Sequence, residues 1–76
     1  MPRSPIDKYV IKQVKKKRLE RGMSQSQLAF ELEVSNGFIG KVESEKYEQK
    51  YSVTQLNEIA KLFNCKLIDF FPELPL

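Results

Sequence analysis

The chain has 76 residues, 41% of them hydrophobic and 30% charged, a balance typical of one folded domain and not of a disordered tail. It has no histidine and one cysteine, Cys65, which excludes Ser-His and Cys-His catalytic pairs, zinc sites of several Cys or His, and an internal disulfide. No apolar run approaches about 18 residues and no signal-peptide pattern is present, so we expect a cytoplasmic protein. We also expect no cofactor.

The charge is unevenly distributed along the chain. The net charge is +3, but residues 1–22 hold eight Lys/Arg against Asp7 and Glu20, so this segment is strongly basic and the remainder is acidic. A basic segment on a nearly neutral body favours a polyanionic partner. An ordinary solvated helix face explains the charge equally well.

The first expected helix follows a short arm. Residues 1–6 contain Pro2 and Pro5 and are predicted to be a flexible N-terminal arm. Asp7 is the expected N-cap of a helix that runs to Arg21, with Gly22 as the residue after its end. The side chains expected on its inner face are Val10, Ile11, Val14, Lys17 and Arg18.

The next expected helix spans about 25–32. Ser24 is a natural N-cap, and Gln27 stands three residues on, where it completes a capping box. Leu28, Ala29 and Leu32 then form one apolar face of a helix of two turns.

A further short helix is predicted at about 36–43, directly after a tight turn. Ser35 is its expected N-cap, and Phe38, Ile39 and Val42 mark its buried side. The opposite face carries the polar or minimal residues Asn36, Gly37, Gly40 and Lys41. A helix with a small, polar outer face suits a DNA major groove about 12 Å wide. The two short helices therefore predict a helix-turn-helix.

Residues 44–52 form a polar connection in which Tyr47 and Tyr51 would either hold the loop against the body of the protein, the more frequent role, or touch DNA. Ser52 and Gln55 repeat the capping-box pattern at the start of a helix that ends near Asn64. Its apolar face is expected to consist of Leu56, Ile59, Ala60 and Phe63.

A short last helix is predicted from the apolar residues Leu67, Ile68, Phe70 and Phe71, and Pro72 stops it. Residues 72–76 form a C-terminal tail. Cys65 lies in an apolar neighbourhood and is predicted to be a core thiol, not a reactive one.

Residues 24–43 resemble the Cro and phage-repressor type of helix-turn-helix domain, whose pattern is SQ-x-x-LA, a turn, and V-S-x-x-x-I-x-x-x-E. The matching residues are Ser24, Gln25, Leu28, Ala29, Val34, Ser35, Ile39 and Glu43. The resemblance implies an all-α, compact five-helix bundle of the lambda-repressor-like type over residues 7–71. It also implies a transcriptional regulator that binds double-stranded DNA, usually as a two-fold homodimer.

The resemblance further assigns roles to individual residues. Asn36, Gly37 and Lys41 match positions that face DNA bases. The expected phosphate contacts are Gln25, Ser35, Lys46, Lys50 and Arg18. Arg18 and Glu43 also match an internal salt bridge of many relatives, although two exposed charges would fit the sequence as well.

The chain departs from the family pattern at two places. Glu33 stands where Gly is common in the turn, and a positive φ there costs Glu about 1 kcal/mol relative to Gly. Lys17 stands where relatives have an apolar residue, and Leu19 is expected to compensate by packing from an adjacent angle.

Two alternatives to a plain regulator stay open. One is an antitoxin or restriction-control subtype, which binds DNA and also a protein partner such as a toxin. The other is an interaction module that kept the fold but lost DNA binding, as Gly37 and the acidic residues Glu31, Glu33 and Glu45 suggest. The apolar stretch 67–76 is the candidate dimerisation segment, with Phe70 assigned to the core.

Overall fold

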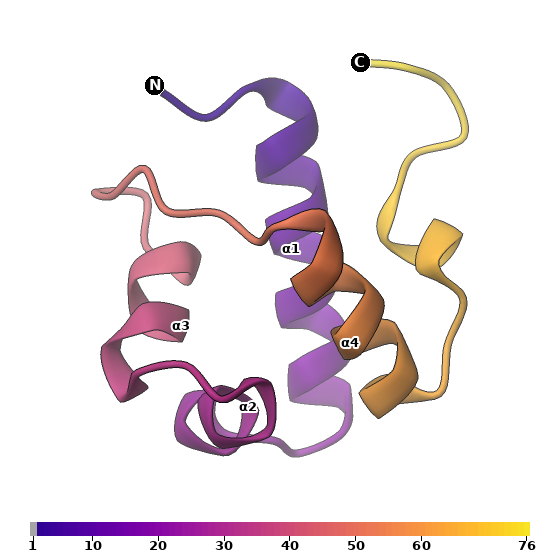
Figure 1. The fold of residues 1–76 in the computed structure, drawn as a ribbon. Coiled ribbons are helices and arrows are strands. Elements are labelled where there is room, and N and C mark those ends of the chain that lie inside the picture. The colour runs from indigo at the N-terminus through magenta and orange to yellow at the C-terminus, as the bar shows by residue number, and fades with distance from the viewer. Residues whose placement is uncertain (1) are drawn as a thin grey trace.

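The protein is an all-α bundle in a computed structural model that describes residues 2–76 (Figure 1). Its helices are α1 Pro5–Glu20, α2 Gln25–Leu32, α3 Asn36–Glu43 and α4 Val53–Phe63, followed by the short 3-10 turn η1 Leu67–Phe70. The predicted fold class is confirmed, and residues 2–76 contain no strand. The expected fifth helix is this single 3-10 turn, because Pro72 follows too closely for an α-helix to extend.

Helix α1 begins three residues earlier than predicted. Its N-cap is Ser4, whose hydroxyl accepts from the backbone N–H of Asp7, while the Asp7 carboxylate accepts from the backbone N–H of Ser4. Asp7 is therefore the third helical residue of a capping box and not the cap. Pro5 occupies the first turn, where its missing N–H costs nothing. Met1 of the expected arm lies outside the described residues.

The other helix ends follow the sequence signals closely. Ser24 with Gln27, and Ser52 with Gln55, form the predicted capping boxes of α2 and α4. The backbone turns left-handed at Glu33 (φ 57°) and at Asn64 (φ 51°), which ends both helices. Glu33 thus adopts the positive φ that the family turn requires, despite its Cβ.

The core lies between α1, α2, α3 and α4, and η1 closes it against α1 and α4. The fully enclosed side chains are Val14, Leu28, Ile39, Val42, Ile59 and Phe70. Lys17 is half-buried, but Leu19 is 58% exposed, so the expected compensation by Leu19 is wrong. It points to the polar side of α1 because it follows Arg18 by one residue.

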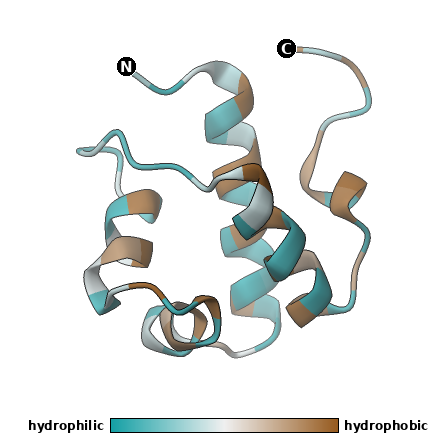
Figure 2. Ribbon diagram, in the orientation of Figure 1, coloured by the Kyte–Doolittle hydropathy of each residue, from teal (hydrophilic) through white to brown (hydrophobic). Residues whose placement is uncertain are grey.

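The C-terminal segment is apolar but only partly covered. Phe70 is in the core, whereas Ile68, Leu74 and Leu76 are largely exposed. Figure 2 shows hydrophobic colour along this segment as well as in the interior of the bundle. Cys65 packs against the core but is only half-buried, so the prediction of a core thiol is met in part.

None of the helices in residues 2–76 combines the length and apolar character that crossing a lipid bilayer requires.

Candidate nucleic-acid interface

Helices α2 and α3 form a helix-turn-helix with one buried and one open side. Ile39 and Val42 of α3 are fully enclosed against the rest of the bundle. On the other side of the helix, Asn36, Gly37 and Lys41 are exposed, as the sequence predicted. A Cβ added at Gly37 would meet nothing within 4 Å, so the protein itself does not require a glycine there.

The first turn of α3 is lightly capped. Ser35 occupies the N-cap position with extended backbone, but its side chain makes no capping hydrogen bond, contrary to the expectation. Its exposed hydroxyl and the first N–H groups of α3 therefore face solvent at the positive end of the helix dipole. This end of the helix suits an anionic partner.

Gln25 at the start of α2 lies across α3. Its side-chain amide donates to Glu43 Oε1 at 2.9 Å, and its Oε1 would lie 3.3 Å from a Cβ built at Gly40. Glycine at position 40 therefore makes room for this side chain. A phosphate contact by Gln25 would use its backbone N–H at the first position of α2.

The predicted ion pair between Arg18 and Glu43 is present and enclosed. The Arg18 guanidinium donates to both carboxylate oxygens of Glu43 at 2.8 Å, and its remaining Nη1 donates to the carbonyl of Met23 at 2.6 Å. The two side chains are only 6% and 2% exposed, which rules out a pair of independent surface charges. Arg18 is consequently not placed as a phosphate contact: its N–H groups point at Glu43 and Met23.

Arg3 is a functional candidate that the sequence analysis missed. Its guanidinium donates to the carbonyls of Lys41, Ser44 and Gln49 at 2.6–3.0 Å, and so caps the C-terminal end of α3 and holds the following loop. A basic residue near unsatisfied C-terminal carbonyls is favourable. The contact spans about forty positions of sequence, so no local pattern signals it.

The loop after α3 places the expected lysines differently. Lys46 is exposed, while Lys50 Nζ lies 3.2 Å from Asp7 Oδ2. The pKa of Asp7 is lowered, chiefly because its carboxylate accepts from the Ser4 backbone N–H and also because Lys50 is close. Lys50 can meet a phosphate only by sharing or leaving this exposed pair.

The two loop tyrosines have separate roles. Tyr51 is buried in the core, and burial together with the nearby Glu43 charge raises the pKa of its phenol. Tyr47 is exposed, and its ring centroid lies 5.8 Å from Lys41 Nζ, within the range of a cation–π contact. Only Tyr47 is therefore available at the surface beside a predicted base-facing residue.

A family model and several solved structures agree with this fold. A family model described as helix-turn-helix matches residues 14–70, and no curated protein matches the chain. The restriction-modification controller protein C.AhdI from Aeromonas hydrophila is a similar solved structure, with 21% identity, TM-score 0.70 and coverage of 83% of this chain and 92% of that one.

Two further solved structures show the same fold. The restriction-modification controller protein C.Esp1396I has 26% identity, TM-score 0.72 and coverage of 90% of this chain and 86% of that one. A hypothetical transcription factor, NHTF from Neisseria, has 13% identity, TM-score 0.70 and coverage of 95% and 87%. The family match runs from the middle of α1 to the end of η1. The chain therefore belongs to the helix-turn-helix family of the Cro and phage-repressor type, a family of DNA-binding transcription regulators.

Proposed function

We propose that this chain is a transcription regulator that binds double-stranded DNA sequence-specifically, with α3 in the major groove, as a two-fold homodimer. The observation that carries the proposal is the exposed edge of α3, formed by Asn36, Gly37 and Lys41, on a helix whose other side is buried. A buried back holds such a helix rigidly, and an open front of small side chains permits close approach to base pairs.

The three edge residues have complementary tasks. Asn36 suits a bidentate contact to adenine, and Lys41 suits donation to O6 and N7 of guanine. Gly37 reads nothing itself but lets the duplex approach the helix backbone. The neighbouring Tyr47 ring restrains Lys41 near this edge before DNA arrives.

The exposed edge of α3, formed by Asn36, Gly37 and Lys41, is called the reading edge from here on. The proposed phosphate contacts lie around it. The Gln25 backbone N–H, Ser35, Lys46 and Lys50 are the proposed contacts, and they position the domain without specifying sequence. The exposed carboxylates of Glu31, Glu33 and Glu45 would repel the DNA backbone. Binding by one domain is thus expected to be modest in affinity and strongly salt-dependent.

Dimerisation is part of the proposal because one short helix reads few base pairs. The segment 67–76 exposes Ile68, Leu74 and Leu76 beside the buried Phe70, and a second copy of the chain is its proposed occupant. Two copies related by a two-fold axis would read inverted half-sites about one helical turn apart.

Restriction-modification control is the second candidate function. It is favoured by the likeness to C.AhdI and C.Esp1396I over most of both chains. An endonuclease gene adjacent to the gene of this chain would support that role, whereas a toxin gene would support the antitoxin subtype with a protein partner.

Selection of bound sites from a random duplex pool tests the proposal. We expect enrichment of an inverted repeat, and polarisation titrations should give tighter binding to the selected duplex than to random duplex at moderate salt. An interaction module without DNA binding would enrich no sequence and would show no binding of duplex in titrations at low salt. The proposal would then be abandoned.

A further inference from the structure

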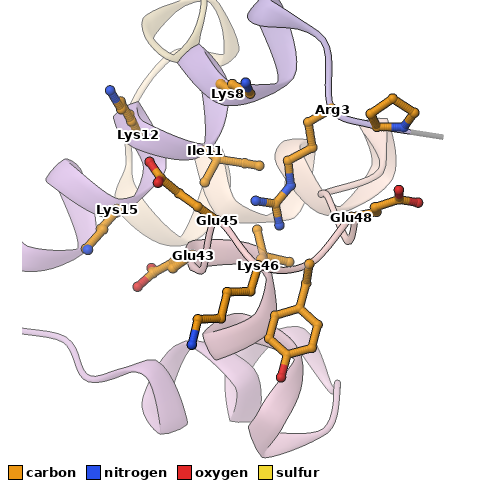
Figure 3. Close-up of a pocket in the computed structure, with 12 residues that line it drawn as sticks. Arg3, Lys8, Ile11, Lys12, Lys15, Glu43, Glu45, Lys46 and Glu48 are labelled. Carbon is orange, nitrogen blue, oxygen red and sulfur yellow. The ribbon is translucent and has the colours of Figure 1, made fainter.

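A basic hollow lies next to the reading edge, between α1 and the loop after α3. It has a volume of about 630 Å³, and its floor includes the buried side chains of Ile11 and Val42. Lys8, Lys12 and Lys15 line it from α1, and Lys46 lines it from the loop. Figure 3 shows the lysines of α1 along one side of the hollow and Lys46 across from them.

Lys8, Lys12 and Lys15 form one row along α1, which we name the α1 lysine row. Positions i, i+4 and i+7 share one face of a helix. All three side chains are exposed, and within residues 2–76 no carboxylate forms a salt bridge with any of them. Like charges at such spacing repel each other, so the row is an unfavourable arrangement that an anion would stabilise.

The acidic residues of the hollow do not neutralise it. Among the described residues, five basic side chains and three acidic ones line the hollow. One of the acidic residues, Glu43, is already paired with Arg18, which adds a further positive charge behind it. The hollow is therefore a net basic surface, and its charge complements a polyanion.

We infer that the α1 lysine row binds the phosphate backbone of the DNA that flanks the base pairs read by α3. This inference rests on the proposed function. It is supported by continuity: Tyr47 lines the hollow and also lies against Lys41 of the reading edge. A DNA strand that leaves that edge can thus pass directly over the hollow.

The dimensions of the row suit a DNA strand. Seven residues of α-helix extend for about 10 Å. One strand of duplex carries a phosphate for about every 3.4 Å of axis, so roughly two or three phosphates fall within the reach of the row. Lysine suits this task, since its ammonium is a point charge on a flexible stem.

The test compares two double variants with the same loss of charge. Lys12→Gln/Lys15→Gln removes two lysines of the row, whereas Lys61→Gln/Lys66→Gln removes two from exposed positions outside the hollow. Lys8 stays unchanged because it neighbours Asp7, which is bonded to Ser4 and Lys50. Binding to the selected duplex is titrated over a series of salt concentrations.

In the row variant, the plot of log affinity against log salt should be less steep, by about 2. Binding to selected and to random duplex should weaken by the same factor. Ethylation interference should show phosphates that matter for the unaltered protein and no longer matter for the variant. The control variant should change the slope less.

Equal slopes for both variants would overturn the inference. A row variant that binds DNA normally but no longer binds inorganic tripolyphosphate would also overturn it, because the row would then be a site for small anions. If the unaltered protein binds no duplex at all, the proposed function fails first.

Discussion

The two ends of α3 are held in opposite ways. At its C-terminal end, Glu43 sits in an enclosed ion pair with Arg18, Gln25 donates to the same carboxylate, and Arg3 caps the last carbonyls. At its N-terminal end, Ser35 makes no side-chain capping bond.

This difference separates the task of holding the helix from the task of reading DNA. Among residues 2–76, the strong polar contacts of α3 lie at its C-terminal end, away from the predicted base contacts Asn36 and Gly37, and Lys41 is the one predicted base contact at that end. The N-terminal turn, with Asn36 and Gly37, keeps its polar groups uncommitted and open to a partner. Damage to the first end should therefore cost stability, and damage to the second should cost DNA binding.

The largest expected effect comes from Glu43→Gln at the held end. The substitution leaves the enclosed Arg18 cation without a carboxylate, a loss that typically costs about 3–5 kcal/mol for buried pairs. In a domain of this size, thermal denaturation should show a fall in Tm of more than about 10 °C. An unchanged melt would show that the pair does not hold α3.

A double variant checks the cause of that loss. Arg18→Met/Glu43→Leu replaces both charges by apolar groups of similar length, which removes the unpaired cation together with its partner. We expect it to be more stable than Glu43→Gln alone. Equal stability of the two proteins would point to lost packing and not to an unpaired charge.

The next effect is on DNA binding by the exposed edge of α3, formed by Asn36, Gly37 and Lys41. Asn36→Ala and Lys41→Ala should each weaken binding to the selected duplex by about 1–3 kcal/mol and relax preference at one base position. Because both side chains are exposed, Tm should stay unchanged. Polarisation titrations with the selected duplex measure the change. Undiminished affinity in both variants contradicts the assignment of this edge to base reading.

Much of this arrangement could be predicted from local sequence patterns. The capping boxes of α2 and α4 and the apolar faces of α2, α3 and α4 depend on residues within about four positions of each other. The positive φ at Glu33 was instead expected from the family pattern. The family pattern supplied the distant Arg18–Glu43 pair. The predicted start of α1 was wrong, because Asp7 is the third helical residue of a capping box with Ser4 and not the cap itself.

Apart from the Arg18–Glu43 pair, the long-range contacts around the site could not be predicted. Arg3 reaches the loop after α3, and Lys50 reaches Asp7, across more than forty residues. Such contacts depend on the angle between packed helices, which no local spacing encodes. For the same reason the lysines of α1 could be counted from the sequence but not placed beside the reading edge.

A smaller loss of stability is expected from Arg3→Ala. It removes hydrogen bonds from the carbonyls of Lys41, Ser44 and Gln49, but water can replace part of them, so we expect a cost of about 1–2 kcal/mol. Amide hydrogen exchange should speed up in the loop after α3 and at the last turn of that helix.

Arg3→Lys is the matched control because it keeps the charge but loses the planar fork of donors. It should restore little of the protection. Full protection in Arg3→Lys would mean that the charge alone, and not the shape of the guanidinium, holds the loop.

The smallest expected effect is also the one that separates the two tasks most directly. Gly37→Ala places a methyl group in open space on the first turn of α3, so it should stabilise the unbound protein by up to about 1 kcal/mol through higher helix propensity. The same methyl group would stand where the duplex approaches the helix, and affinity for the selected site should fall although Tm rises. Gly40→Ala is the contrasting variant, because its methyl group would press on the Gln25 side chain within the protein. Gly40→Ala should therefore change the Tm of the unbound protein, measured by thermal denaturation. If Gly37→Ala raises Tm and leaves DNA affinity intact, then the first turn of α3 does not lie close to DNA, since only a distant partner leaves room for the added methyl group.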